Sequence, residues 1–123
     1  MAKNVLLIGL QPDVVDFSQV PGLTESKLLA GLDMSAQLLN SKGFNAQWCL
    51  LDCGENSVAD VTERLMNRKN EVVVIGAGIR IDPKHLILFE QIINKVVELS
   101  PQSKIAFNTL PFDVLDAVER WGK

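Results

Sequence analysis

The stretch that decides the fold is residues 71–83, which read EVVVIGAGIRIDP. It opens with a short run of β-branched residues without polar alternation, which is typical of a strand covered on both faces in a parallel sheet. Gly76 and Gly78 follow, and a glycine either adopts a positive φ or lets another group approach the backbone closely. Asp82 then serves as N-cap and Pro83 as the first residue of a helix. The stretch therefore predicts a buried strand, a glycine turn and a helix.

The same alternation of strand and helix extends along the whole chain. Further strands are predicted at residues 5–10, 46–51 and 104–107, and helices at 24–43, 57–69, 83–99 and 111–121. This order implies one α/β domain spanning residues 1–123, a three-layer α/β/α sandwich with a four-stranded parallel sheet and right-handed crossovers. The purely apolar first and third strands belong in the centre, so the predicted strand order is 2-1-3-4.

Several predicted helices carry signals at their ends. Thr24 is an N-cap for the first helix, and Gly43 closes it. Ser57, with Asp60 three residues later, resembles a capping box. The last helix opens at Pro111 and presents one apolar face made of Val114, Leu115, Val118 and Trp121.

Composition narrows the classes of function. The net charge is −3 and the lysines and arginines are scattered, which argues against binding to nucleic acid or to an anionic membrane. Only six apolar residues, 5–10, follow Lys3, too few for a signal or transmembrane segment, so we expect a cytoplasmic protein. Cys49 and Cys53 lie on one predicted strand, where their Cα atoms would be about 13 Å apart, beyond the reach of a disulfide. Unpaired cysteines fit a reducing compartment.

In general arrangement the predicted fold resembles a shortened flavodoxin-like, Rossmann-like or receiver-like domain. A receiver needs an acidic pair after the first strand and an aspartate after the third, where this chain has Gln11 with Asp13, and Gly76. The dinucleotide fingerprint needs a third glycine after Gly78, and no lysine follows to complete a P-loop. The resemblance is to a layout and to no family's motif.

A ligand site is predicted at the carboxyl edge of the sheet, where the direction of winding reverses between strands 5–10 and 71–75. The candidate ligand-binding residues at this edge are Gly9, Gln11, Asp13, Gly76, Gly78, Arg80 and Asn108. Arg80, beside the free N–H groups of a helix start, would hold a small anionic or phosphorylated ligand. The alternative is a surface arginine paired with Asp82 or with the loop after the fourth strand. Likewise, the two glycines either face a ligand or make a turn needed for packing.

Catalytic residues and cofactors stay unassigned at this stage. Cys53 is a possible nucleophile, although Asp52 and Glu55 beside it would raise its pKa. His85 is a possible general base, but it has no obvious partner and would be solvated. Asp13 or Asp52 could act as an acid or base, bind a metal ion, or merely cap a turn. One histidine and two cysteines without ligand spacing predict no transition-metal site.

Helix 83–99 suggests a second function. Its apolar residues exceed the one stripe that packing on a sheet requires, since Ile87 and Leu88 extend well around the helix from Phe89 and Ile93. The alternative function is therefore a non-catalytic interaction module that forms a homodimer through this helix. The long connection 11–23 would separate the two hypotheses, because a ligand-binding protein should order it over the cleft.

Overall fold

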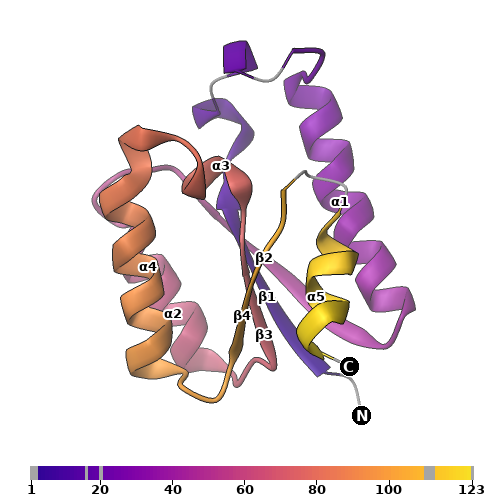
Figure 1. Cartoon of the computed structure of the whole chain (residues 1–123), viewed down its shortest axis with the longest axis vertical. Coiled ribbons are helices and arrows are strands. Elements are labelled where there is room, and N and C mark those ends of the chain that lie inside the picture. The colour runs from indigo at the N-terminus through magenta and orange to yellow at the C-terminus, as the bar shows by residue number, and fades with distance from the viewer. Residues whose placement is uncertain (1–2, 16, 20, 110–112, 123) are drawn as a thin grey trace.

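The computed structural model describes residues 3–15, 17–19, 21–109 and 113–122. At its centre lies a parallel four-stranded sheet with strand order β2-β1-β3-β4, as predicted (Figure 1). The strands are β1 (Lys3–Leu10), β2 (Phe44–Leu51), β3 (Val72–Ile75) and β4 (Lys104–Phe107). In register, Ile8 of β1 lies beside Cys49 of β2 and Ile75 of β3, so these three strands end close to the same level.

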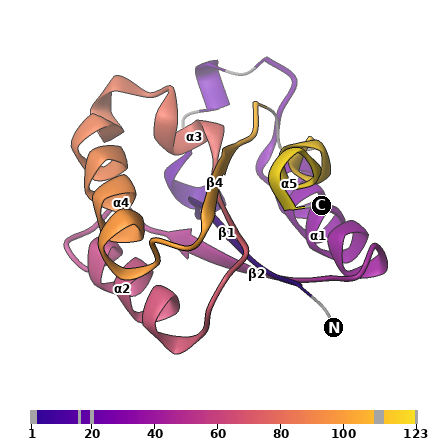
Figure 2. The same ribbon diagram turned by 60° about the horizontal axis from the view of Figure 1, so that its bottom comes forward.

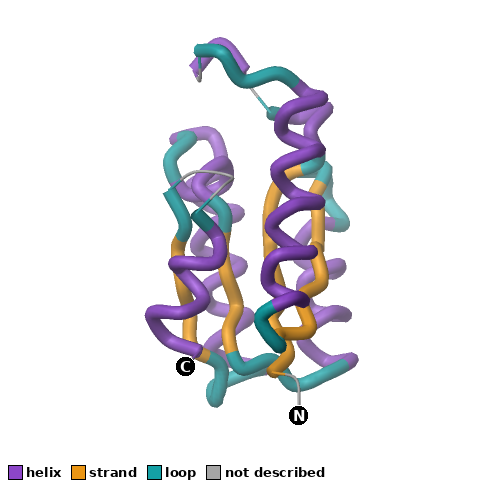
Figure 3. Tube along the Cα trace, turned by 90° about the vertical axis from the view of Figure 1, so that its right-hand side faces the viewer, coloured by secondary structure: helices purple, strands orange, loops and turns teal. Residues whose placement is uncertain are grey.

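Two helices cover each face of the sheet, which gives the predicted three layers (Figures 2 and 3). The helices are α1 (Glu25–Ser41) and α5 (Val114–Gly122) on one face, and α2 (Ser57–Asn67) and α4 (Leu86–Leu99) on the other. The short elements at the carboxyl edge are η1 (Pro12–Val14), η2 (Phe17–Gln19), α3 (Ala77–Arg80) and η3 (Pro83–His85). No helix in the described ranges is long and apolar enough to cross a membrane.

The central strands are apolar from Val5 to Leu10 in β1 and along all of β3, because both faces of the sheet are buried there. Leu6 and Ile8 of β1 point into the cluster beneath α2 and α4, whereas Val5 and Leu7 point into the cluster beneath α1 and α5. Successive side chains of a strand point to opposite faces, so a strand buried on both sides needs apolar residues at every position. This explains why the first and third predicted strands are the central ones.

The ends of α1 confirm the sequence signals. The Thr24 hydroxyl accepts a hydrogen bond from the Lys27 N–H at 3.2 Å. Gly43 follows the helix with φ +92°, a left-handed conformation that glycine adopts without steric cost.

The helix predicted at 83–99 is present as α4 over Leu86–Leu99, and its first three residues form the 3₁₀ turn η3. α3 begins directly after Gly76, and the chain then passes through η3 before α4 starts at Leu86. Asp82 does act as a cap, because its Oδ1 accepts a hydrogen bond from the Lys84 N–H at 3.0 Å, but the element it caps is a 3₁₀ turn. Gly76 has φ −68°, and positive φ among the described glycines occurs only at Gly22 and Gly43.

The predicted capping box is wrong, and the predicted apolar face of the last helix is correct at Val114, Leu115 and Val118 but not at Trp121. Ser57 makes no capping bond to α2; its Oγ instead lies 3.4 Å from Oδ1 of Asp52. Trp121 is 54% exposed, because α5 approaches the sheet along the row Val114, Val118 and Gly122. A Cβ on Gly122 would lie 3.0 Å from Cγ2 of Val72, so this close approach turns the neighbouring Trp121 away. Pro111 lies outside the described residues.

Candidate functional site

Gly76 joins the ends of the central strands at the carboxyl edge. Its N–H donates to the carbonyl oxygen of Ile8 at 2.8 Å, and a Cβ added to it would lie 3.2 Å from that same oxygen. That Cβ would also lie 3.7 Å from Cα of Gly9 and 3.9 Å from Oδ1 of Asn108. The structure thus brings Gly9, Gly76 and Asn108 together, as predicted, and Gly76 is placed there by close packing of backbone.

Arg80 lies at the end of α3 and reaches across to the loop after β4. Its Nη2 donates to the carbonyl oxygen of Asn108 at 2.7 Å, and its guanidinium carbon lies 5.4 Å from the ring centroid of Phe107. Its Nε is buried and has no acceptor among the described residues. No carboxylate in the described ranges comes within ion-pair distance of the guanidinium. Arg80 is therefore held in place while its charge remains without a counter-ion from those residues.

Among the other predicted site residues, Gln11 and Gly9 make contacts within the fold, whereas Asp13 and Gly78 are exposed. The Gln11 backbone N–H donates to the Leu51 carbonyl at 2.8 Å, which ties the end of β1 to the end of β2. Gly9 leaves room for the Trp48 ring, since a Cβ there would lie 3.1 Å from Cζ3. Asp13 and Gly78 are exposed, in η1 and α3 respectively.

The helix start after β3 does not offer free N–H groups, in contrast to the prediction. The N–H of Lys84 donates to the Asp82 carboxylate, and the N–H groups of His85 and Leu86 donate to backbone carbonyls. The Asp82 carboxylate, moreover, occupies the place that a bound anion would take. The predicted anion contact at this edge is therefore Arg80 and not the N–H groups at the start of η3.

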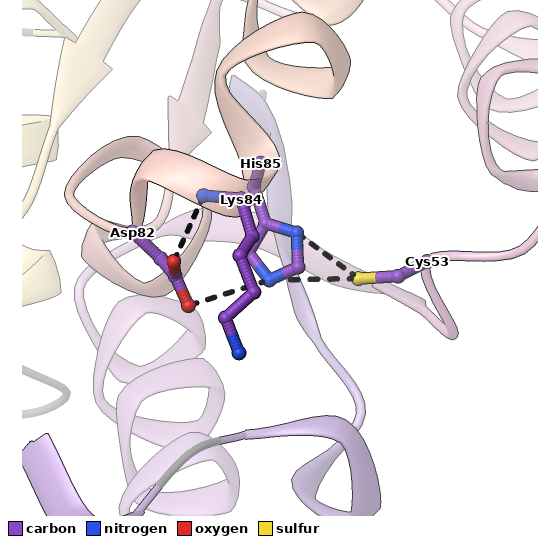
Figure 4. Close-up of polar contacts among 4 residues, drawn as sticks. All are labelled: Cys53, Asp82, Lys84 and His85. Carbon is purple, nitrogen blue, oxygen red and sulfur yellow. Dashed lines mark hydrogen bonds and ion pairs between the residues drawn. The ribbon is translucent and has the colours of Figure 1, made fainter.

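A second group of chemically active side chains lies at the same edge. The His85 imidazole lies between the Cys53 thiol and the Asp82 carboxylate (Figure 4). Its Nδ1 is 3.8 Å from Sγ of Cys53, and its Nε2 is 3.8 Å from Oδ2 of Asp82. His85 is therefore neither solvated nor without partners, contrary to the sequence interpretation.

Cys53 has an unusual backbone and an unfavourable environment for a thiolate. It is the one non-glycine residue with positive φ, 64°, in the part of the chain that the structure describes. Burial raises the pKa of its thiol, and the negative charges of Asp52 and Asp82 raise that pKa further. The resting side chain is thus the neutral thiol. Cys49, in contrast, is almost fully buried beneath α2, and burial raises the pKa of its thiol as well.

Sequence reasoning did not connect Cys53 with His85, because their strands are not neighbours. Cys53 follows β2 and His85 follows β3, and β1 lies between these strands. However, both right-handed crossovers run in the same direction across the sheet, so α2 and α4 pack on the same face. Their starts consequently meet above the end of β1. The predicted strand order implies that α2 and α4 share one face of the sheet, so the proximity of Cys53 and His85 follows from the topology and not from their positions in the sequence.

Neither a metal-binding cluster among the described residues nor a similarity to known proteins indicates what this site does. Among the residues whose placement is described, no group of three His, Cys, Asp or Glu side chains is arranged to hold a metal ion. No protein-family model matches the chain, and no curated protein matches it significantly.

Proposed function

We propose that the chain binds a small anionic or phosphorylated ligand at the carboxyl edge of the sheet, with Arg80 as the charged contact. The observation that carries this proposal is the set of contacts that the Arg80 guanidinium makes. One nitrogen is fixed on the Asn108 carbonyl, the plane lies near the Phe107 ring, and the buried Nε has no acceptor in the described ranges. A planar arginine fork held in this way is suited to the oxygens of a phosphate or carboxylate.

Leaving a buried N–H without an acceptor costs about 1–3 kcal/mol. A ligand oxygen would recover this free energy once the atoms that cover Nε move aside to admit it. Gly9 and Gly76 lie at the same edge, where a Cβ on Gly76 would be 3.9 Å from Oδ1 of Asn108. The proposed ligand therefore lies toward β3 and β4, on the side of the edge away from the acidic turn after β2.

The test is the melting temperature in the presence of inorganic phosphate, sulfate, sugar phosphates and mononucleotides. A ligand present at a hundred times its Kd adds roughly 2.7 kcal/mol to the free energy of unfolding. We expect a stabilising compound to act on the wild type and to have no effect on Arg80→Ala. Each variant is compared with its own ligand-free melting temperature, because Arg80 also holds Asn108.

Arg120→Ala is the matched control. Arg120 donates to the Phe107 carbonyl at 2.8 Å, so the variant removes the same charge and a similar contact at the neighbouring position of the same strand end. The stabilisation by ligand should survive in Arg120→Ala. Equal stabilisation of the wild type and Arg80→Ala would refute the role of Arg80, and no stabilisation by any compound would favour the second candidate.

That second candidate is a homodimeric interaction module that uses α4. Leu86, Ile87 and Val97 are each more than half exposed on the solvent side of this helix. Leu86 and Ile87 lie at its start and Val97 roughly 16 Å further along, with Glu90 and Asn94 between them. An antiparallel pair of α4 helices about a twofold axis would place the apolar start of one copy against Val97 of the other. The partner we propose is therefore a second copy of the chain. Leu88, which was predicted to belong to the excess apolar surface of this helix, packs against the core instead.

We also infer that the protein works in a reducing compartment such as the cytoplasm. Cys49 and Cys53 are both free thiols. Labelling of the thiols in cells before lysis would test this inference, and a disulfide formed by either cysteine in cells would contradict it.

A further inference from the structure

We propose that Cys53 is a nucleophile for acyl transfer, that His85 is its general base, and that Asp82 orients and stabilises the imidazole. The substrate class is a neutral activated acyl compound, such as an ester or thioester. This site is separate from the proposed anion contact at Arg80 and does not depend on it.

The first argument is the order of the three groups. Sγ of Cys53 is 3.8 Å from Nδ1 of His85 and 4.0 Å from Nε2, and Nε2 is in turn 3.8 Å from Oδ2 of Asp82. The thiol, the imidazole and the carboxylate thus follow one another as a nucleophile, a base and a group that stabilises the charged base. The distance from Nε2 to Oδ2 is that of an ion pair, so Asp82 acts through its charge once His85 is protonated.

The second argument is how rigidly Asp82 and Cys53 are held. Oδ1 of Asp82 accepts the Lys84 N–H, which leaves Oδ2 directed at the ring (Figure 4). Cys53 stands on the turn between β2 and α2 with φ 64°, a left-handed conformation that is sterically unfavourable for a residue with a Cβ. Strain of this kind persists only where its surroundings enforce it, and a strained turn from strand to helix is one way in which proteins expose a nucleophile.

The charged side chains around Cys53 favour a neutral substrate. Asp52 and Glu55 in the turn after β2, together with Asp82, make this end of the sheet edge acidic, and Lys84 is the cation beside them. An anionic substrate would be repelled by the carboxylates. A neutral acyl compound avoids this repulsion, and its leaving group can take up the proton that His85 acquires from the thiol.

The reaction balances with water as the only co-reactant. The Sγ–H proton moves to Nδ1 of His85 as the bond from Sγ to the acyl carbon forms. The bond from that carbon to the leaving group then breaks, and the leaving group takes the proton from Nδ1. In the second half, water gives a proton to Nδ1 and its hydroxyl to the acyl carbon; the bond from carbon to sulfur breaks, and Cys53 recovers the proton.

The test is acetylation of the full chain by p-nitrophenyl acetate, followed by release of p-nitrophenol and by mass mapping of the acetylated residue. We expect one acetyl group on Cys53 and none on the buried Cys49, with Cys53→Ser losing the rapid phase. General bases contribute typically 10²–10⁴-fold, so His85→Asn should be slower by at least about tenfold near neutral pH. The wild-type rate should show a pH dependence that His85→Asn lacks. The rate of His85→Asn should instead rise only in the alkaline range where the thiolate forms.

Two charge-matched variants separate positioning from structure. Asp82→Asn retains an oxygen that can cap Lys84 but removes the charge facing His85, so we expect a slower rate with little loss of stability. Asp52→Asn removes a charge next to Cys53 that makes no contact with the imidazole, since Oδ1 of Asp52 accepts from the Gly54 N–H at 2.8 Å. Its rate should be at least that of the wild type. A His85→Asn variant with the wild-type rate and pH profile would overturn the proposal, as would acetylation at any residue other than Cys53. Because the probe is neutral, neither result depends on anion binding at Arg80.

Discussion

Gly76→Ala and Gly78→Ala, two residues apart, are expected to change stability in opposite directions. A Cβ on Gly76 would lie 3.2 Å from the Ile8 carbonyl oxygen, which the Gly76 N–H already binds at 2.8 Å. Both groups are backbone, so relief requires β1 and β3 to separate locally. Overpacking of this kind costs about 1–3 kcal/mol, and replacement of glycine by alanine returns about 0.4–1 kcal/mol through the unfolded state. The net loss is about 0.5–2 kcal/mol.

At Gly78 the same substitution meets no obstacle. A Cβ there would lie 3.4 Å from Cδ1 of Leu10, an ordinary contact with a flexible side chain, and the residue is exposed within α3. Replacing a helical glycine with alanine without strain stabilises a protein by about 0.4–1 kcal/mol. Gly78→Ala is thus the matched control for the effect of alanine on the unfolded chain.

The assay is thermal unfolding followed by circular dichroism, supported by urea titration. For a chain of this length 1 kcal/mol corresponds to about 4 °C in Tm, so Gly76→Ala should melt roughly 2–8 °C lower and Gly78→Ala roughly 2–4 °C higher. If Gly76→Ala melted at or above the wild-type temperature, the close approach to Ile8 could not be the reason for glycine. The alternative interpretation, a backbone position that faces a ligand, would then gain support.

Three further predictions concern Cys53, Cys49 and α4. Because φ is positive at Cys53, Cys53→Gly should be more stable than Cys53→Ala by about 1 kcal/mol in urea unfolding, the reverse of the order found in helices. Burial raises the pKa of the Cys49 thiol above its ordinary value of 9.0, so folding favours the protonated thiol. The associated stability is present below about pH 9 and is lost as the pH rises toward the folded-state pKa, and Cys49→Ala should reduce this alkaline loss in urea titrations. If α4 mediates dimers, sedimentation equilibrium should show that Ile87→Lys weakens association whereas Met34→Lys, at an equally exposed position on α1, does not. A wild-type monomer at high micromolar concentration would remove the dimer hypothesis.

The arrangement of the sheet could be predicted because the sequence pattern reports burial directly. β1 from Val5 to Leu10 and the whole of β3 are apolar and buried, whereas β2 alternates and β4 is short. The 3₁₀ turn at the start of the predicted helix 83–99, and the short α3 before it, could not be predicted in the same way. Asp82 and Pro83 start a 3₁₀ turn as readily as an α-helix, and the carbonyl of Gly76 accepts the N–H groups of Ile79 and Arg80 to close a turn before them.

The candidate site divides along a similar line. The sequence brought Gly76, Arg80 and Asn108 to one edge because each follows a predicted strand or its turn, and this grouping is present in the structure. The contact between Cys53 and His85 was not predicted from the sequence. It depends on α2 and α4 packing side by side above β1, a strand that is adjacent in the chain to neither helix. The positive φ of Cys53 likewise could not be predicted, because a sequence pattern would assign a positive φ to the following residue, Gly54.

The edge strands bear on how copies of the chain could associate. The outward N–H of Ala46 in β2 donates to the Asn40 side chain at 2.9 Å, and the Trp48 carbonyl accepts from Arg64 at 3.2 Å. Side chains therefore occupy backbone groups that an added strand would need. An edge protected in this way does not invite pairing with another sheet.

The opposite edge is protected by the same means. The Phe107 carbonyl in β4 accepts a hydrogen bond from Arg120 at 2.8 Å, and the strand is only four residues long. With both edges occupied, an extended sheet across two copies would have to break side-chain contacts before forming any of its own. Self-association would instead use side chains on a helix, where Leu86, Ile87 and Val97 are already exposed and would gain about 25 cal/mol for each Å² of apolar surface removed from water. Substitutions on α4 are consequently the decisive test of the dimer hypothesis, and substitutions that unblock β2 or β4 are expected to promote aggregation.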